Sequence, residues 1–376
     1  MESRKHDGHG HERKQPSRLK LNSAAKTEWI KIWEPNHEKD ISYAIAALLL
    51  GAALAAPLQA AELVTVDNFA RAETDRTMKD YVDLGGFGKF YHTRVPSPLD
   101  KQSVVRLNLD TLYSFGVFDL TTPVTITLPD SGDRFMSALI ISEDHSMLPV
   151  VYAPTEFTVT QEQMGTRYVI IALRTFMAAT DKDDIAKANA LQDKVTVSQA
   201  EVGSFDVPEW DQDSLLKVRG ALAVLASSVS DTRGFFGDKS KLDRLDFLMG
   251  TAAGWGGNPK EAAIYFTHSP EKNDGKIPYS VTVKDVPLEG NGFWSITVYN
   301  EANYLEPNDL GVNALNNVTA KKNADGSITI NAGGCDDGRI NCIPITKGWN
   351  YVARTYRPRP EIVSGDWVFP EMQPAK

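Results

Sequence analysis

Short apolar runs dominate the chain from about residue 104 to residue 175. They are rich in β-branched and aromatic residues and are separated by Pro, Gly, Asp and Thr, which is typical of strands joined by turns. The pattern predicts strands at residues 104–107, 113–120, 124–128, 135–142, 147–152, 157–160 and 168–175. Such close spacing predicts a β-sandwich or barrel rather than alternating strands and helices.

Helical periodicity marks four segments, and a second series of strands follows them. The predicted helices are residues 68–84, 183–191, 211–229 and 241–251, and the later strands are residues 262–267, 279–286, 293–299, 328–330 and 350–356. We therefore predict a mainly β fold with helical connections. An N-terminal β-sandwich or barrel is expected at residues 61–205, a helical connection at 206–250 and a C-terminal β domain at 251–376.

The first sixty residues have a different character. Residues 1–40 are polar and lack apolar periodicity, which predicts a disordered extension. Residues 43–56 are apolar and uncharged, and small residues follow at 57–61. This run is shorter than the roughly 20 residues of a transmembrane helix and has the length of a signal-peptide core. We expect a signal peptide near 41–60, a mature N-terminus near Ala61 and a periplasmic or secreted protein, with a retained membrane anchor as the alternative.

The chain has two cysteines, Cys335 and Cys342, in a segment rich in Gly and Asp. Such a segment can close on itself, and an exported protein meets an oxidising compartment. We predict a disulfide between them. A structural zinc site needs four ligands, and the sequence has no second Cys pair to supply them. Neither a metal nor a cofactor is expected.

Composition and charge limit the partners. The hydrophobic content of 42% and the charged content of 24% are ordinary for a globular protein. The formal net charge of −9 leaves no basic stripe to neutralise phosphates, which argues against nucleic acid as a partner. We expect a small-molecule ligand or substrate and membrane contact only through the N-terminal signal segment. The sequence leaves open whether the protein forms a homo-oligomer.

Residues 108–114 place several polar side chains directly before a predicted buried strand. Such a polar elbow on a rigid strand is a common position for binding and catalytic groups. We select Asp110 and Tyr113 as catalytic candidates and Asn108 and Thr111 as ligand-binding candidates. The alternative is that the Asn, Asp and Thr side chains bond to loop backbone groups and that Tyr113 is a core aromatic residue.

His145 is the third catalytic candidate, because its carboxylate neighbours at a strand end could raise its basicity. A serine hydrolase would pair it with Ser114, Ser146 or Ser295. The Gly-x-Ser-x-Gly motif that supports such a reading is missing from the sequence.

Three further candidates for ligand binding are Arg134, Trp294 and Tyr299. Arg134 follows a Gly-Asp turn, where it could bind an anion or pair with a carboxylate of the protein. Trp294 and Tyr299 lie in a strand whose alternate residues face opposite sides. One of these two faces is expected to oppose the elbow across a ligand site shared by the two β domains.

Several separated motifs resemble a bacterial family built from two domains of unknown function, numbered 1254 and 1214. The motifs are residues 108–114, 128–135, 293–300, 323–327 and 354–358. The resemblance implies an N-terminal β-sandwich and a jelly-roll-like C-terminal β domain. Family members commonly have Arg in place of Leu109, and many have Asn-Trp-Leu-Pro where this chain has Asn341-Cys342-Ile343-Pro344. Asn341 is therefore included among the ligand-binding candidates.

Two classes of function remain open. One is an exported enzyme, most simply a hydrolase, that acts on a small or amphiphilic substrate. The other is a periplasmic or envelope protein that binds a small ligand without chemistry. A contact between His145 and Asp110 or a serine in a concave site would favour the enzyme.

Overall fold

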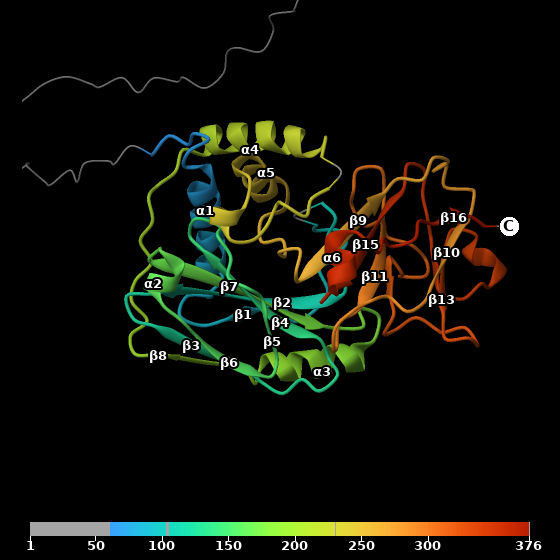
Figure 1. The fold of residues 1–376 in the computed structure, drawn as a ribbon, viewed down its shortest axis with the longest axis horizontal. Helices are drawn as coiled ribbons and strands as arrows, with labels where there is room; N and C mark the ends of the chain where they lie inside the picture. The colour runs from blue at the N-terminus through green and yellow to red at the C-terminus, as the bar shows by residue number, and fades with distance from the viewer. Residues whose placement is uncertain (1–60, 103–104, 230, 376) are drawn as a thin grey trace, which may run out of the picture. The chain divides into compact units, whose positions relative to one another are not determined.

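The computed structural model describes residues 61–102, 105–229 and 231–375, which belong to one compact unit. The predicted signal segment lies outside these residues. In the described ranges, 16 strands form four open sheets (Figure 1). The predicted mainly β class is confirmed, and open sheets favour the sandwich alternative over the barrel. The domain boundaries at residues 205 and 250 stay a prediction.

Two sheets enclose the N-terminal β core. The five-stranded sheet has the order β1 (Tyr91–His92), β2 (Thr111–Asp119), β7 (Tyr168–Phe176), β4 (Met136–Ser142) and β5 (Val151–Tyr152). The three-stranded sheet has the order β6 (Thr155–Val159), β3 (Val124–Leu128) and β8 (Thr196–Gln199). Side chains of β2, β3, β4 and β7 form the apolar core between the two sheets. β4 and β7 are buried along their whole length because both of their faces are covered.

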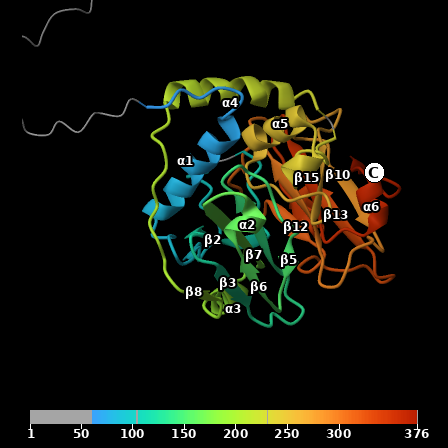
Figure 2. The same ribbon diagram turned by 60° about the vertical axis from the view of Figure 1, so that its left-hand side comes forward.

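Helices cover the second face of the five-stranded sheet. Among the described residues the helices are α1 (Phe69–Asp83), which lies on this face, α4 (Gln212–Ala226) and α5 (Arg244–Gly254), which pack on α1, and α2 (Gln161–Met164), α3 (Lys182–Gln192) and α6 (Pro360–Ser364), which lie elsewhere in the fold. Met78 of α1 packs against Val117 and Ile170 of the sheet. The other side of α1 packs against α4 and α5, as both ribbon views show (Figures 1 and 2). Asp side chains cap the N-termini of α3, α4 and α5 by accepting hydrogen bonds from backbone N–H groups.

Two four-stranded sheets enclose the C-terminal β core. One has the order β14 (Cys342–Ile343), β13 (Ile328–Ala332), β10 (Tyr279–Val283) and β16 (Gln373–Pro374). The other has the order β12 (Ala314–Asn316), β11 (Trp294–Tyr299), β15 (Asn350–Tyr356) and β9 (Ala263–His268). Trp294, Trp349 and Tyr351 are the large side chains of the core between them. β9 is an edge strand, which matters for the pocket described below.

Two predicted strands differ from the structure, and the strands β1, β8, β12, β14 and β16 were not predicted. Residues 105–107 form a turn instead of a strand, because Arg106 has a positive φ of 54° and its carbonyl group accepts a hydrogen bond from Arg354. Between residues 147 and 152, only Val151–Tyr152 is a strand, since the N–H of Met147 donates to Gly237. None of the helices within the described ranges is long and apolar enough to cross a membrane.

The predicted disulfide between Cys335 and Cys342 is present, with an S–S distance of 1.97 Å and a Cα–Cα distance of 5.6 Å. It joins the short 3₁₀ turn Cys335–Asp337 to strand β14. The bridge therefore closes a loop at the edge of the C-terminal sheet.

Candidate functional site

The polar elbow at residues 108–114 lies where the two sets of β-sheets meet. Asp110, which is only 1% exposed, accepts a hydrogen bond from Asn316 Nδ2 at 3.1 Å. The Tyr299 hydroxyl donates to the carbonyl oxygen of Leu107 at 2.8 Å. Asn316 and Tyr299 belong to β12 and β11 of the C-terminal β region. The elbow therefore contacts the second β region directly.

Arg354 of β15 links these groups. Its guanidinium donates to Thr297 Oγ1 at 2.9 Å, to the Tyr299 hydroxyl at 2.7 Å and to the carbonyl oxygen of Arg106 at 2.9 Å. Burial raises the pKa of Asp110, while Ser295, Arg354 and Asn316 act in the opposite direction. The junction thus holds a buried arginine and a buried carboxyl group close together.

The other elbow residues contact one another. Asn108 Nδ2 donates to Thr111 Oγ1 at 3.0 Å and to the Tyr113 hydroxyl at 3.2 Å, and Asn108 Oδ1 accepts from the N–H of Asp110 at 3.1 Å. The last bond is an ordinary Asx turn, as the structural alternative anticipated. The hydrogen bond from Asn108 Nδ2 to the Tyr113 hydroxyl is not part of this turn. Asn108, Asp110, Thr111, Tyr113 and Tyr299 are thus brought together.

His145 is placed differently. It is 1% exposed, its Nε2 accepts a hydrogen bond from the N–H of Gly256 at 3.0 Å, and its Nδ1 lies 2.9 Å from Thr251 Oγ1. The Thr251 hydroxyl in turn donates to Phe247, which leaves its oxygen to accept from Nδ1–H. Burial lowers the pKa of His145 to about 3, so the ring is neutral. Both ring nitrogens are occupied by groups other than Asp110 or a serine. The structure therefore does not bring His145 together with the other two catalytic candidates.

Arg134, Trp294 and Asn341 also lie apart from the elbow contacts. Arg134 forms an ion pair with Asp184 and donates to the carbonyl oxygen of Phe176 at 2.7 Å. Trp294 is buried in the core of the C-terminal sandwich, because the opposite face of β11 meets the elbow. Asn341 bonds to the backbone of Lys321 and Thr329. Each of the three has protein partners in its own surroundings.

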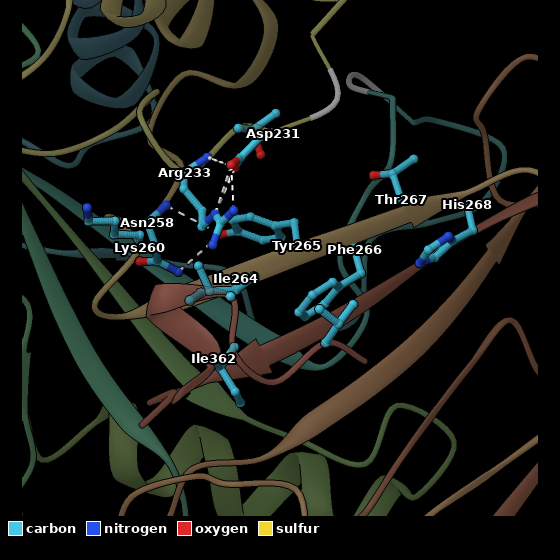
Figure 3. A pocket seen from close by; sticks show the side chains of 14 residues that line it. Asp231, Arg233, Asn258, Lys260, Ile264, Tyr265, Phe266, Thr267, His268 and Ile362 are labelled. Carbon is cyan, nitrogen blue, oxygen red and sulfur yellow. Dashed lines mark hydrogen bonds and ion pairs between the residues drawn. The ribbon is translucent and has the colours of Figure 1, made fainter. Parts of the chain in front are cut away.

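A pocket of about 350 Å³ lies along the edge strand β9 (Figure 3). We call it the β9 pocket. Its apolar wall consists of Ala263, Ile264, Phe266, Ile362 and Val368. Its polar lining consists of Asp231, Thr232, Arg233, Asn258, Lys260, Tyr265, Thr267 and His268. The volume falls within the range of small-molecule sites.

Arg233 holds one wall of the β9 pocket in place. Its guanidinium binds the Asp231 carboxylate through Nε at 2.9 Å and Nη2 at 2.6 Å. Its Nη1 donates to the carbonyl oxygen of Val363 at 3.3 Å and lies over Gly365, where a Cβ atom would be only 2.7 Å away. Because Arg233 and Asp231 neutralise each other, the exposed ammonium group of Lys260 is left to supply positive charge.

Asn258 and His268 belong to the polar lining of the β9 pocket, and both interact with neighbouring side chains. The N–H of Asn258 donates to the Tyr265 hydroxyl at 3.3 Å, and Asn258 Oδ1 has no partner within the described residues. His268 Nδ1 lies 3.4 Å from Glu371 Oε1, and burial lowers the pKa of His268 despite this carboxylate. Figure 3 shows Asn258 and His268 toward opposite ends of the β9 side chains. Both ends of the pocket are therefore polar, with the aromatic ring of Phe266 between them.

Arg354, the buried Arg174 of β7 and the residues of the β9 pocket were not among the sequence-predicted site residues. Arg174 and Arg354 are charged residues inside otherwise apolar strands, and that contrast was a usable signal. The residues of the β9 pocket gave no such signal, because they come from separate segments near residues 231–233, 258–268 and 362–368. Only the folded chain brings those segments together.

Comparison with family models gave two matches. Residues 87–156 match "Protein of unknown function (DUF1254)" and residues 262–360 match "Protein of unknown function (DUF1214)". This chain combines a DUF1254 region with a DUF1214 region. The predicted resemblance is therefore confirmed, and the elbow and β9 lie in different family regions.

Among solved structures, the chain is similar to the VPA0106 protein from Vibrio parahaemolyticus. The sequence identity is 18%, the TM-score is 0.60, and the match covers 83% of this chain and all of that one. A second similar structure is an uncharacterised protein from Burkholderia cenocepacia, with 14% identity, a TM-score of 0.47 and coverage of 82% and 88% of the two chains. The first likeness supports the same fold. The comparison with curated proteins found no match.

Proposed function

We propose that the protein binds a small amphiphilic molecule in the β9 pocket. The observation that carries this proposal is a cavity of about 350 Å³ with an apolar wall between two polar ends. Pockets that bind small molecules combine a mostly apolar lining with a few convergent polar groups. The proposal takes up the ligand-binding alternative from the sequence analysis.

The lining suggests how such a ligand would lie. Its apolar body would contact Phe266, Ile264 and Ile362. Because Asp231 neutralises Arg233, a negative group of the ligand would be attracted chiefly by Lys260. An uncharged hydroxyl or amide group would bond to Asn258, at the end of the pocket opposite His268. A ligand with one acidic group and an apolar body fits these features.

The experiment measures binding of anilinonaphthalene sulfonate, an apolar dye with one negative charge, by its fluorescence. The blocking variant is Val368→Trp, since Val368 lines the pocket and is 60% exposed, so that a larger side chain is tolerated at the rim. The matched control is Leu310→Trp, at a 53% exposed position outside the pocket. We expect Val368→Trp to abolish saturable binding and Leu310→Trp to retain it. Equal binding by both variants would refute the proposal.

A second variant tests the charge. Lys260→Gln is expected to weaken dye binding about fivefold, since an exposed charge contributes about 1 kcal/mol. Lys272→Gln, at an exposed lysine outside the β9 pocket, is the control. Equal losses in the two variants would mean that the dye responds to overall charge instead of to Lys260.

The hydrolase hypothesis and export stay proposals with their own tests. A panel of esters and sulfate esters tests hydrolysis, with Tyr113→Phe as the comparison variant.

Export is supported by the apolar run at residues 43–56 and by the disulfide, which is typical of oxidising compartments. Intact mass of the protein recovered from its native host should give an N-terminus at or near Ala61. A cytosolic species that retains residues 1–60 would contradict export.

A further inference from the structure

Arg174 of β7 is a buried cation at the junction between the two β regions. It is 6% exposed, and its Nη2 donates to the carbonyl oxygen of Gly256 at 2.7 Å. Its Nη1 is buried and has no hydrogen-bond partner among the described residues. The groups that favour its charged form are tyrosines, namely Tyr113, Tyr265 and Tyr356. A buried guanidinium surrounded by phenols, instead of carboxylates, favours the ionised form of the nearest phenol.

Tyr113 is the tyrosine best placed to respond. It lies opposite Arg174 in the pairing of β2 with β7, and the guanidinium carbon is 5.4 Å from the centre of its ring. Burial alone would raise the pKa of Tyr113, but Arg174 and the hydrogen bonds of Asn108 and Thr111 lower it below the ordinary value. The electrostatic surroundings of Tyr113 thus make its phenol easier to ionise than that of an ordinary tyrosine.

The pKa values of neighbouring tyrosines are shifted in the opposite direction. Burial raises the pKa of Tyr152 to about 12 and also raises the pKa values of Tyr81 and Tyr356. Tyr81 of α1 and Tyr356 of β15 are the other titratable groups that interact with Tyr113. Both stay neutral near neutral pH, so they do not cancel the effect of Arg174. Tyr113 differs from them because the Arg174 guanidinium lies over its ring and Asn108 donates a hydrogen bond to its oxygen.

The pair is also held rigidly and lies partly at the surface. Gly256, which accepts the hydrogen bond of Arg174, donates its own N–H to the buried ring of His145 at 3.0 Å. His145 therefore positions Arg174 through one residue of backbone. Tyr113 itself is partly exposed. A preorganised and partly accessible acid–base group is a common feature of catalytic sites.

We propose that Tyr113 is the acid–base residue of a catalytic site at this junction and that Arg174 stabilises its phenolate. In the reaction step, the phenolate oxygen takes a proton from a substrate hydroxyl group, or from a carbon next to a carbonyl group. The electron pair of the broken bond stays on the substrate as an alkoxide or enolate. The proton returns from Tyr113 to the product, and the phenolate is restored. The proposal is independent of ligand binding in the β9 pocket.

The test needs no known substrate. The whole protein is treated with an aryl sulfonyl fluoride, which phenolates attack: an oxygen–sulfur bond forms, the sulfur–fluorine bond breaks and fluoride leaves. Labelled tyrosines are identified by mass spectrometry, and the pH dependence of labelling gives each apparent pKa. We expect Tyr113 to react faster near neutral pH than Tyr91, a partly buried tyrosine of β1.

Variants separate this activation from simple exposure. Arg174→Met should slow labelling of Tyr113 and raise its apparent pKa, and Arg174→Lys, which keeps the charge, should restore part of the rate. If Arg174→Met fails to fold, Asn108→Asp serves instead, because a carboxylate beside the Tyr113 oxygen should also raise its pKa. Labelling of Tyr113 no faster than Tyr91, or a pKa unaffected by both variants, would overturn the proposal.

Discussion

The buried carboxyl group of Asp110 accepts its hydrogen bond from Asn316, a residue 206 positions later in the chain, at 3.1 Å. Asn316 Oδ1 meanwhile accepts from the backbone of Val318 and Thr319. One amide side chain therefore shapes the end of β12 and also binds the polar elbow. The contact ties the DUF1254 region to the DUF1214 region.

Asn316→Asp tests this contact. The new carboxylate keeps the acceptor for the Val318 and Thr319 N–H groups, but it places a second carboxyl oxygen against Asp110. We expect the free energy of unfolding to fall by about 3 kcal/mol, because the buried carboxyl group of Asp110 loses its donor and faces a second carboxyl group. Denaturant titration at neutral pH measures the loss. The control is Asn317→Asp, whose carboxylate still accepts from the N–H of Trp294. A loss no larger than in the control would contradict the assignment.

His145 should make stability fall in acid. Its pKa is lowered from 6.5 to about 3 in the folded chain. Above pH 6.5 the ring is neutral in both states, and below it the unfolded chain takes up a proton that the folded chain refuses. Stability is therefore lost by about 1.4 kcal/mol per pH unit as the pH falls through this window.

The measurement compares the wild type with His145→Asn by denaturant titration at several pH values. The variant should be less stable near neutral pH, and the difference should shrink in acid. His92→Asn, at a partly buried histidine of β1 whose pKa burial also lowers, is the comparison variant that shows how much of the acid loss comes from another histidine. A difference that does not change with pH would show that His145 is not the titrating group.

Asp75 should make the stability of the protein fall as the pH rises, which is opposite to the effect of His145. Burial raises its pKa to about 7, with a further contribution from Glu143, and its Oδ2 accepts from Trp210 at 2.9 Å. The folded chain thus binds a proton that the unfolded chain releases above about pH 4. This contribution is present below that pH and is lost as the pH rises toward 7.

Asp75→Asn removes the titration, keeps an acceptor for Trp210 and offers Glu143 a donor. We expect the variant to be more stable than the wild type above neutral pH by about 2 kcal/mol, with the margin shrinking in acid. Asp80→Asn, on the exposed side of the same helix, is the control. A variant that is less stable than the wild type at every pH would contradict the protonated state of Asp75.

Removal of the disulfide should have a moderate effect. Cys335 and Cys342 are separated by 7 positions, and so short a loop restricts the unfolded chain only modestly. The double variant Cys335→Ser, Cys342→Ser should lose about 2 kcal/mol of stability. Reductant should have the same effect on the wild type and none on the variant. Thiol labelling of denatured, unreduced protein at both cysteines would show that the bridge does not form.

Elements with a local pattern of apolar and polar residues were predictable from the sequence. Strand β3 matches its predicted range because every second residue is apolar, strand β15 also matches its predicted range, and α1 and α3 differ from prediction by one residue at each end. The two cysteines were enough to predict the disulfide, because no other pairing was available within the chain. The elbow also stood out, since its polar residues precede an apolar strand directly.

Only the tertiary structure decided which of these residues meet. The side-chain period of β11 offered two faces, and the packing of the C-terminal sandwich buried Trp294 and turned Tyr299 toward the elbow. His145 has the local sequence of a catalytic histidine, but burial and two hydrogen bonds make it a neutral structural group. Arg174 and Tyr113 are 61 positions apart and face each other because β2 and β7 are antiparallel neighbours. Contacts of this kind depend on strand order and register, which local periodicity does not encode.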